Sequence, residues 1–259
     1  MTGSLAGRVA LVTGGGRGVG RGISMALAAD GATVAVNYRR DSESAEETVA
    51  AIVAAGGKAQ AYSASVDDYS QNAEMVAAIE ADHGAIGILV NNAGIASRGQ
   101  SVEQTDPAEL QRVVATHAFG PHYLSKLVIP KMRTLDRGDI IMISSVATRS
   151  LSGFGAPYNM GKTAMEALAY TLAKEERPNG IRVNIVAPGL VDTDMGQRLM
   201  NALQGVEDIR SLDDSMPWGR VCQPEDVANV VTFLVSDANS YLTGERLYCD
   251  GGGQDISRR

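Results

Sequence analysis

The chain has 259 residues, 44% of them of types that favour burial and 20% charged, as expected for a globular protein with a full-sized core. Its 23 Lys and Arg against 30 Asp and Glu give a net charge of −7, which disfavours binding to a nucleic-acid backbone. The sequence shows no secretory signal, no apolar run of membrane-spanning length and no zinc-ligand spacing around its two cysteines, so we expect a cytoplasmic protein without metal or membrane partner.

Short β-rich runs alternate with longer segments of helical spacing along the chain. Strands are predicted at 8–13, 32–38, 58–64, 87–92, 139–145, 181–188 and 245–250. Helices are predicted near 18–30, 42–56, 70–83, 106–134, 156–177 and 223–236, with start signals at Ser70 and Pro224. The interior strands are apolar on both faces, which predicts an α/β fold with a parallel sheet covered by helices on both sides.

The alternation has no linker or repeat, so residues 1–259 are expected to form a single domain. Only the segment 189–222 breaks the rhythm, and Met195, Leu199, Met200 and Leu203 share one helical face within it. An insertion after the C-terminal end of a strand lies where α/β sheets bind ligands, so one interpretation is a substrate lid at about 190–218. The other is a surface excursion packed on the core.

A glycine-rich turn follows the first predicted strand and leads directly into a helix. Without Cβ atoms, Gly14, Gly16, Gly18 and Gly20 let the backbone approach a pyrophosphate, which free N–H groups and the helix dipole would bind. The strict G-x-G-x-x-G pattern is absent, so a tight turn without a ligand is the alternative. The position of the turn favours a dinucleotide site.

The end of the second strand indicates which dinucleotide. A carboxylate there would bind the ribose of NAD, but Tyr38, Arg39 and Arg40 come before the first acid, Asp41. Together with Arg17, these arginines could bind a 2′-phosphate. NADP(H) is therefore preferred and NAD(H) remains possible; alternatively, the arginines are only solvated.

Tyr158 and Lys162 are four residues apart on a predicted helix and share one face, where an ammonium would favour the phenolate. Tyr170 and Lys174 repeat this spacing, but a rise of about 18 Å and a rotation of about 120° prevent both pairs from facing one site. The first pair lies near the helix start, close to Ser144 and Ser145 at the end of a strand. We therefore expect Tyr158, Lys162 and a neighbouring serine to form the reactive site.

Several motifs together resemble the short-chain dehydrogenase/reductase family. The matching residues are Thr13-Gly14-x3-Gly18-x-Gly20, Asn91-Asn92-Ala93-Gly94, Ser145, Tyr158-x3-Lys162 and Pro188-Gly189. Further segments are similar to the bacterial 3-oxoacyl-acyl-carrier-protein reductase branch: Arg17, Ala187-Pro188-Gly189-x3-Thr193-Asp194-Met195, Pro224-Glu225-Asp226-Val227-Ala228, Thr243-Gly244 and Asp250-Gly251-Gly252. The likeness extends over essentially the whole chain.

The resemblance implies a Rossmann-type three-layer sandwich with a seven-stranded sheet, and hydride transfer between a nicotinamide and a carbonyl or secondary alcohol. It assigns Tyr158 as proton donor or acceptor, Lys162 to lower the Tyr158 pKa and hold the ribose, and Ser145 to position the reacting oxygen. It implies a dinucleotide site lined by Gly14, Gly16, Arg17, Gly18, Val19, Gly20, Tyr38, Arg39, Arg40, Ser65, Val66, Asn92, Ala93, Gly94, Tyr158, Lys162, Pro188, Gly189, Val191 and Thr193. It also implies a small-molecule carbonyl or alcohol substrate, which could be a carrier-bound acyl chain, and a homotetramer built through two long helices and the C-terminal segment.

Two positions depart from the family pattern. His117 stands where the family usually has an Asn that supports a water in the proton relay; it could hold that water or relay a proton, or be an ordinary helix residue. Ser65 precedes Val66 where the family commonly has an Asp, so here the backbone, and not an Asp side chain, is expected to meet the adenine.

Other functions remain open at this point. The same fold and cofactor could serve a steroid, sugar or xenobiotic ketone, and a non-catalytic nucleotide-binding homologue would keep the fold without turnover. Lys131, Arg133 and Arg137 could attract an acidic carrier protein or form a solvated face.

Overall fold

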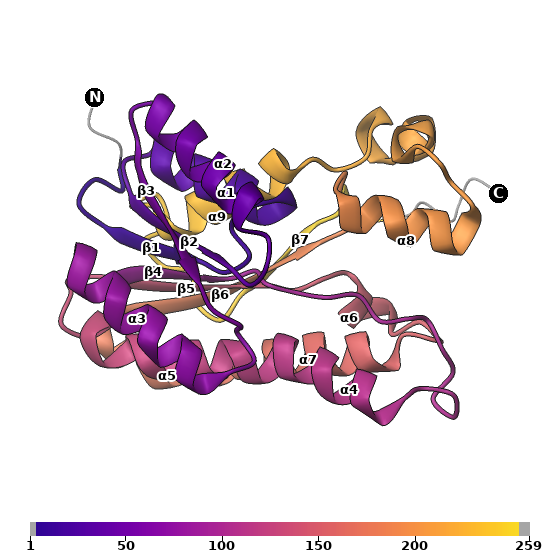
Figure 1. The fold of residues 1–259 in the computed structure, drawn as a ribbon, viewed down its shortest axis with the longest axis horizontal. Helices are drawn as coiled ribbons and strands as arrows, with labels where there is room; N and C mark the ends of the chain where they lie inside the picture. The colour runs from indigo at the N-terminus through magenta and orange to yellow at the C-terminus, as the bar shows by residue number, and fades with distance from the viewer. Residues whose placement is uncertain (1–3, 254–259) are drawn as a thin grey trace.

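The computed structural model describes residues 4–253, which form a seven-stranded parallel sheet between two layers of helices (Figure 1). The strands are β1 (Val9–Val12), β2 (Thr33–Tyr38), β3 (Lys58–Ser63), β4 (Ile86–Asn91), β5 (Gly138–Ile143), β6 (Ile181–Pro188) and β7 (Arg246–Cys249). All six lateral pairings are parallel. The predicted Rossmann-type fold class is confirmed.

The strands lie in the order β3-β2-β1-β4-β5-β6-β7. From β1 the chain builds outward to β3, then crosses to the other side of β1 and builds outward again from β4 to β7. The direction of winding therefore reverses between β1 and β4, and this point opens a crevice beyond the C-terminal ends of the strands.

Two helical layers cover the sheet. One face carries α1 (Gly18–Ala29), α2 (Ser42–Ala54) and α9 (Pro224–Val235); the other carries α3 (Tyr69–His83), α4 (Pro107–Val114), α5 (Gly120–Met132) and α7 (Ala156–Glu176) (Figure 1). Every residue of β4 and β5 is buried, because helices shield both of their faces. Two apolar cores result, one on each side of the sheet, with Leu89 in one and Val90 in the other.

Side-chain caps explain where several helices begin. The Asp41 carboxylate accepts the Ser44 N–H at the start of α2, and Gln223 and Asp226 form a capping box at the start of α9. At α3 the expected cap, Ser70, is wrong: Asp68 caps the helix and accepts the N–H of Ser70 at 2.9 Å. A carboxylate two residues before Ser70 reaches the free N–H groups of the first turn.

The long helix predicted at 106–134 is interrupted. A π-helical turn, Ala115–Phe119, separates α4 from α5 and contains His117. Gly120 follows directly, and a Cβ there would lie only 2.8 Å from the Val66 carbonyl oxygen. Because π turns often occur at functional sites, this interruption indicates that the segment around His117 belongs to such a site.

The segment after β6 carries helix α8 (Asp194–Gln204) and two short 3-10 turns, Ile209–Ser215 and Pro217–Gly219. Met200, Ile209 and Val221 form a small core of its own within this segment. A parallel bridge between Val191 and Cys222 joins its two ends. Figure 1 shows α8 standing apart from the two helical layers, beside the C-terminal end of the sheet.

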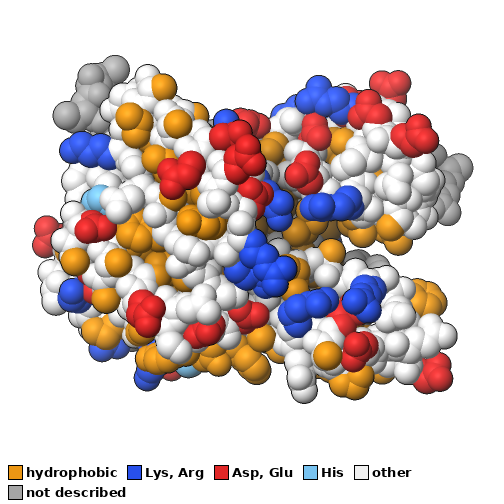
Figure 2. Space-filling model, viewed as in Figure 1, with side chains coloured by type: hydrophobic (Ala, Val, Ile, Leu, Met, Phe, Trp, Pro, Cys, Tyr) orange, Lys and Arg blue, Asp and Glu red, His pale blue; other side chains and the backbone are white. Residues whose placement is uncertain are grey.

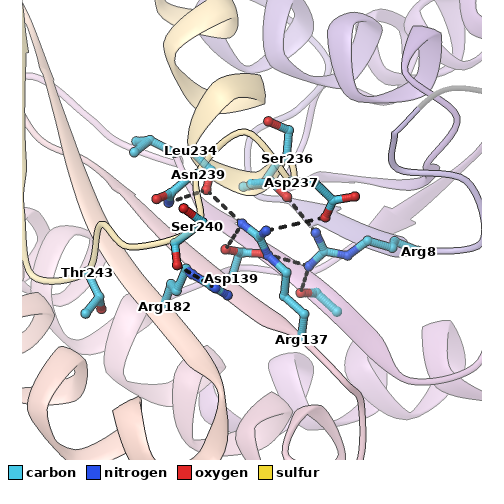
Figure 3. Close-up of polar contacts among 12 residues, drawn as sticks. Arg8, Arg137, Asp139, Arg182, Leu234, Ser236, Asp237, Asn239, Ser240 and Thr243 are labelled. Carbon is cyan, nitrogen blue, oxygen red and sulfur yellow. Dashed lines mark hydrogen bonds and ion pairs between the residues drawn. The ribbon is translucent and has the colours of Figure 1, made fainter.

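A buried carboxylate lies near the N-terminal end of β5, at the end of the sheet away from α8. Asp139 is fully buried in β5 and binds Arg8 at 2.7 Å and Arg137 at 2.8 Å (Figure 3). The same guanidinium groups donate to the last carbonyls of α9, Arg8 to Val235 at 2.7 Å and Arg137 to Leu234 at 3.2 Å. This cluster, Arg8, Arg137 and Asp139, therefore ties β1, β5 and the C-terminus of α9 together and favours the helix dipole. None of the helices in residues 4–253 has the length and apolar character needed to cross a membrane.

We predict that Asp139→Ala lowers the free energy of unfolding by about 3–5 kcal/mol, because it leaves two largely buried guanidinium groups without their counter-charge. Asp237 is the control: it faces Arg137 at 3.6 Å, but its side chain is 87% exposed. Asp237→Ala should change the unfolding free energy by less than about 0.5 kcal/mol. Urea unfolding measures both variants, and equal losses would contradict this role of Asp139.

Candidate active site

One large cleft runs along the C-terminal ends of the strands and encloses about 3000 Å³. Figure 2 shows it as a deep indentation beside the lobe that carries α8, with basic side chains gathered along it. This volume exceeds that of a typical single-ligand pocket, ~300–1,000 Å³, and suits two molecules side by side. The structure brings every residue predicted for the site into the lining of this cleft: Gly14, Gly16, Arg17, Gly18, Val19, Gly20, Tyr38, Arg39, Arg40, Ser65, Val66, Asn92, Ala93, Gly94, Ser145, Tyr158, Lys162, Pro188, Gly189, Val191 and Thr193.

The glycine turn between β1 and α1 has the form that a pyrophosphate requires. Gly14 and Gly18 have φ of +59° and +51°, a left-handed backbone that favours glycine. A Cβ on Gly20 would lie 2.1 Å from the Gly14 carbonyl oxygen, so the turn can close only with glycine there. Asn92 supports it through its amide, which donates to the Thr13 carbonyl at 2.8 Å. No side chain caps α1, so its N-terminal N–H groups are available to an anion in the cleft.

The basic residues predicted to select the cofactor lie at the end of β2. Tyr38 is half-buried, whereas Arg39 and Arg40 are exposed at the cleft. Arg17 lies across the turn, 3.4 Å from the Asp41 carboxylate. That carboxylate is committed to the N-terminus of α2, and the hydrogen bonds from Ser44 lower the Asp41 pKa.

Ser145, Tyr158 and Lys162 meet at the centre of the cleft. The Ser145 side chain lies close enough to the Tyr158 hydroxyl to influence its pKa. Burial raises the pKa of Tyr158, and the Ser145 side chain opposes this shift. The phenol is therefore protonated near neutral pH.

Lys162 is buried against the end of β5 instead of touching the phenol oxygen. Its ammonium donates to the Ile143 carbonyl at 2.6 Å and lies 5.7 Å from the centroid of the Tyr158 ring. Burial lowers the pKa of Lys162 to about 7, and the charge of Glu166 works in the opposite direction. The expected lowering of the Tyr158 pKa by Lys162 is absent from this geometry, because the ammonium is directed at a backbone carbonyl.

His117 fills the space between α7 and the loop after β4. Its ring meets the Tyr158 ring edge to face, with centroids 5.1 Å apart. A Cβ on Gly94 would lie 2.7 Å from the His117 ring, and one on Gly161 would lie 2.9 Å from the His117 Cβ. Both glycines thus make room for this imidazole.

The imidazole of His117 is neutral in the folded protein. Burial lowers its pKa to about 3, and the neighbouring Lys162 charge adds to the effect. Nε2 faces the Ile95 backbone, 2.8 Å from its carbonyl oxygen and 3.3 Å from its N–H nitrogen. Nδ1 is buried and has no hydrogen-bond partner within residues 4–253.

The second Tyr-Lys pair lies elsewhere on the same helix. Lys174 is exposed, Tyr170 is half-buried, and neither lines the cleft. The geometric separation of the two pairs expected from the helix spacing is therefore present in the structure.

The outer part of the cleft is apolar. Met195, Leu199 and Leu203 of α8 are 40%, 46% and 67% exposed and line it. Phe154 and Trp218 line it too, with exposures of 67% and 86% and a left-handed backbone, φ +63° in each. Bulky side chains are rarely held in this strained conformation, and such strain is concentrated at functional sites.

Sequence reasoning missed Glu166, a buried carboxylate one turn beyond Lys162. The signal was available, because Tyr158, Lys162 and Glu166 continue a single four-residue spacing along α7. Phe154 and Trp218 had no signal of this kind, since neither belongs to a periodic pattern. Within residues 4–253 no group of His, Cys, Asp and Glu is arranged to hold a metal ion.

Comparisons with known proteins agree with this geometry. A family model described as enoyl-(acyl carrier protein) reductase matches residues 14–254. An uncharacterized oxidoreductase of Methylorubrum extorquens is 38% identical, covering 96% of this chain and 98% of its own. A 3-oxoacyl-[acyl-carrier-protein] reductase of Synechocystis is 36% identical over 96% of this chain and 98% of the relative.

Among solved structures, a double mutant of a Serratia marcescens short-chain dehydrogenase/reductase is 34% identical with a TM-score of 0.86, over 96% of this chain and 98% of that one. Family model, relatives and solved structure all cover nearly the whole chain. The chain belongs to the short-chain dehydrogenase/reductase family, near its 3-oxoacyl-acyl-carrier-protein reductase branch, and is an oxidoreductase of the kind that uses a nicotinamide nucleotide.

Proposed function

We propose that the protein transfers a hydride between NADP(H) and the carbon of a carbonyl or secondary alcohol, with Tyr158 as proton donor or acceptor. The observation that carries this proposal is the meeting of Ser145, Tyr158 and Lys162 in the cleft onto which the glycine turn opens. The nicotinamide supplies or accepts the hydride when it is bound. Ser145 holds the reacting oxygen, and Tyr158 exchanges the proton with it.

The charge state of these residues favours the reductive direction. Burial raises the pKa of Tyr158, so its phenol carries the proton that a developing alkoxide needs. The Lys162 ammonium then stabilises the phenolate that forms. The Ile143 carbonyl keeps that ammonium next to the site until the charge develops.

We predict that Tyr158→Phe folds and binds NADPH but lowers kcat by about 10²–10⁴-fold, because the proton donor is lost while the packing surface stays. Tyr170→Phe is the matched control on the same helix and should keep kcat within about twofold of the wild type. NADPH oxidation at 340 nm gives kcat, and NADPH fluorescence gives the dissociation constant. Undiminished turnover by Tyr158→Phe would refute its assignment as proton donor.

The preference for NADP(H) over NAD(H) is also a proposal. Arg17, Arg39 and Arg40 surround the end of β2, and the nearest carboxylate, Asp41, already accepts hydrogen bonds from Ser44. A 2′-phosphate would receive charge-assisted hydrogen bonds from these guanidinium groups.

Accordingly, Arg39→Asp should lower kcat/KM for NADPH by about 10–100-fold, the effect of losing one charge-assisted bond and adding a like charge. The value for NADH should stay the same or rise. Lys58→Asp makes the same change in charge at an exposed position at the start of β3 and serves as the control. If Arg39→Asp has the same kcat/KM as the wild type with both nucleotides, these arginines do not select the cofactor.

The apolar outer cleft supports a substrate whose carbonyl is attached to an apolar body. Met195, Leu199 and Phe154 would cover that body while Tyr158 faces the oxygen. In this proposal the segment at about 190–218 acts as the substrate lid of a single domain, residues 1–259. Steroid and xenobiotic ketones fit such a wall better than sugars do.

A 3-oxoacyl chain on a carrier protein is the second candidate, supported by the reductase relative from Synechocystis. The expected basic patch does not add to this support, because each of its residues is already paired. Lys131 binds Glu80 at 2.8 Å, and Arg133 binds Glu176 at 2.6 Å. Arg137 belongs to the buried cluster with Asp139.

We keep the homotetramer and the cytoplasmic location as proposals. Association would cover the exposed apolar side chains of Phe119 and Met160, which are 51% and 53% exposed beside the long helices. The last part of the C-terminal segment predicted to take part, residues 254–259, lies outside the described residues.

A neutral His117 acts by hydrogen bonding and packing rather than by carrying a proton. Its pKa is about 3 in the folded protein and about 6.5 when unfolded, so only the unfolded chain binds a proton between these values. Stability is therefore lost as the pH falls below about 6.5, by about 1.4 kcal/mol per unit.

We predict that this histidine costs the wild type about 2 kcal/mol of unfolding free energy on going from pH 7 to pH 5. His117→Asn removes this contribution, while the other titrating groups are unchanged, so its loss over the same interval should be smaller by that amount. Urea unfolding at both pH values measures the difference. Equal losses in the two proteins would mean that His117 is protonated in the native state.

A further inference from the structure

Three successive turns of α7 hold three consecutive residues at the end of β5. Lys162 donates to the Ile143 carbonyl at 2.6 Å, and Glu166 accepts from the Ser144 hydroxyl at 2.5 Å. Tyr158 faces the third residue, Ser145, which influences the pKa of its hydroxyl. The middle contact, between Glu166 and Ser144, involves no group that touches a reacting atom.

Glu166 holds Ser145 from both sides along the chain. Its Oε1 atom accepts from Ser144, just before Ser145, and from the Thr148 hydroxyl at 2.8 Å, just after it. Thr148 lies 2.9 Å from the Ser145 carbonyl oxygen as well, but the carboxylate is the stronger acceptor for its single hydrogen. Through these two hydrogen bonds, Glu166 restrains the backbone before and after Ser145.

Glu166 is a buried carboxylate paired with a basic side chain. It is 4% exposed, and its Oε2 atom binds Arg246 of β7 at 2.6 Å. With Ser144 and Thr148 on Oε1, three donors contact this carboxylate. One helical turn away lies the buried Lys162, which is 3% exposed.

We propose that Glu166 is a positioning residue of the active site: it fixes the Ser145 peptide through Ser144 and Thr148, and it places a negative charge one helical turn from Lys162. This proposal rests on the proposed function, since it assigns a role relative to Ser145 and Lys162. In this proposal the ion pair between Glu166 and Arg246 joins α7 to β7 and also holds the Glu166 carboxylate in place beside Ser144 and Thr148.

Several charged or titratable groups face this pair. On α7 these are Tyr158 and Tyr170, on β7 Arg246 and Tyr248, and on the π turn the neutral His117. Glu166 is the anion among them that acts on Lys162, and it raises the Lys162 pKa against the effect of burial. Removing its charge should therefore let the Lys162 pKa fall below about 7.

Two variants separate the two parts of the proposal. Glu166→Gln keeps an oxygen that can accept from Ser144 and Thr148 but removes the charge, so the alkaline limb of the kcat profile should move to lower pH by about 1 unit. The double variant Ser144→Ala with Thr148→Val keeps the charge but removes both donors. Its kcat should fall about tenfold while the limb stays in place, because Ser145 loses its fixed position.

Glu176→Gln is the matched control, because Glu176 is another buried carboxylate of α7 in an ion pair, with Arg133 at 2.6 Å. It should leave the pH profile unchanged. The double variant Glu166→Gln with Arg246→Met avoids an unpaired guanidinium and keeps the test valid if the single variant folds poorly. NADPH binding, followed by fluorescence, should stay within about twofold in all variants.

The proposal is overturned if Glu166→Gln, alone or with Arg246→Met, has the wild-type alkaline limb, or if Glu176→Gln moves the limb equally. It is also overturned if the Ser144 and Thr148 double variant keeps the wild-type kcat. If the wild type itself oxidises no NADPH with any carbonyl compound, the proposed function fails instead, and the two failures are distinguishable.

Discussion

The candidate active site depends on the contact between helix α7 and the C-terminal end of β5. A buried ammonium, Lys162, is held by a backbone carbonyl, Ile143, at the point where a strand of the sheet's interior gives way to a loop. An unpaired buried charge would be costly, so this contact fixes the rotation and height of α7 against the sheet. Tyr158 lies one turn before Lys162 and therefore faces Ser145.

Buried charged groups lie at both ends of the strands, and they have different roles at the two ends. At one end of the strands, Asp139 and its two arginines bind strands and a helix end. At the other, Lys162 and Glu166 are buried where the polar groups of the cleft have to stay in place. We expect ligands at this second position because the winding reverses between β1 and β4, and such a reversal leaves a crevice at the C-terminal ends of the strands.

Much of the fold and the site could be predicted from the sequence, for physical reasons that differ between residues. Strands such as β4 and β5 are apolar on both faces, so local pattern was enough to find them. Tyr158 and Lys162 share a helical face, and their position near the end of a strand distinguished them from Tyr170 and Lys174, which have the same spacing. The π turn at His117 was not predictable, because it results from close packing with Gly94, Gly161 and Val66, which are distant in sequence. The direction of the Lys162 ammonium also depends on a tertiary contact, with Ile143.

The central claim is that this cleft reduces a carbonyl on an apolar body with NADPH. Initial rates of NADPH oxidation across a panel of ketones, from alkyl and aryl ketones of increasing length to hydroxylated and carboxylated ones, test it most directly. The account predicts a kcat/KM that rises with apolar surface, by up to about fourfold per buried methylene, and a lower kcat/KM with NADH. Tight NADPH binding without oxidation by any ketone in the panel would contradict it.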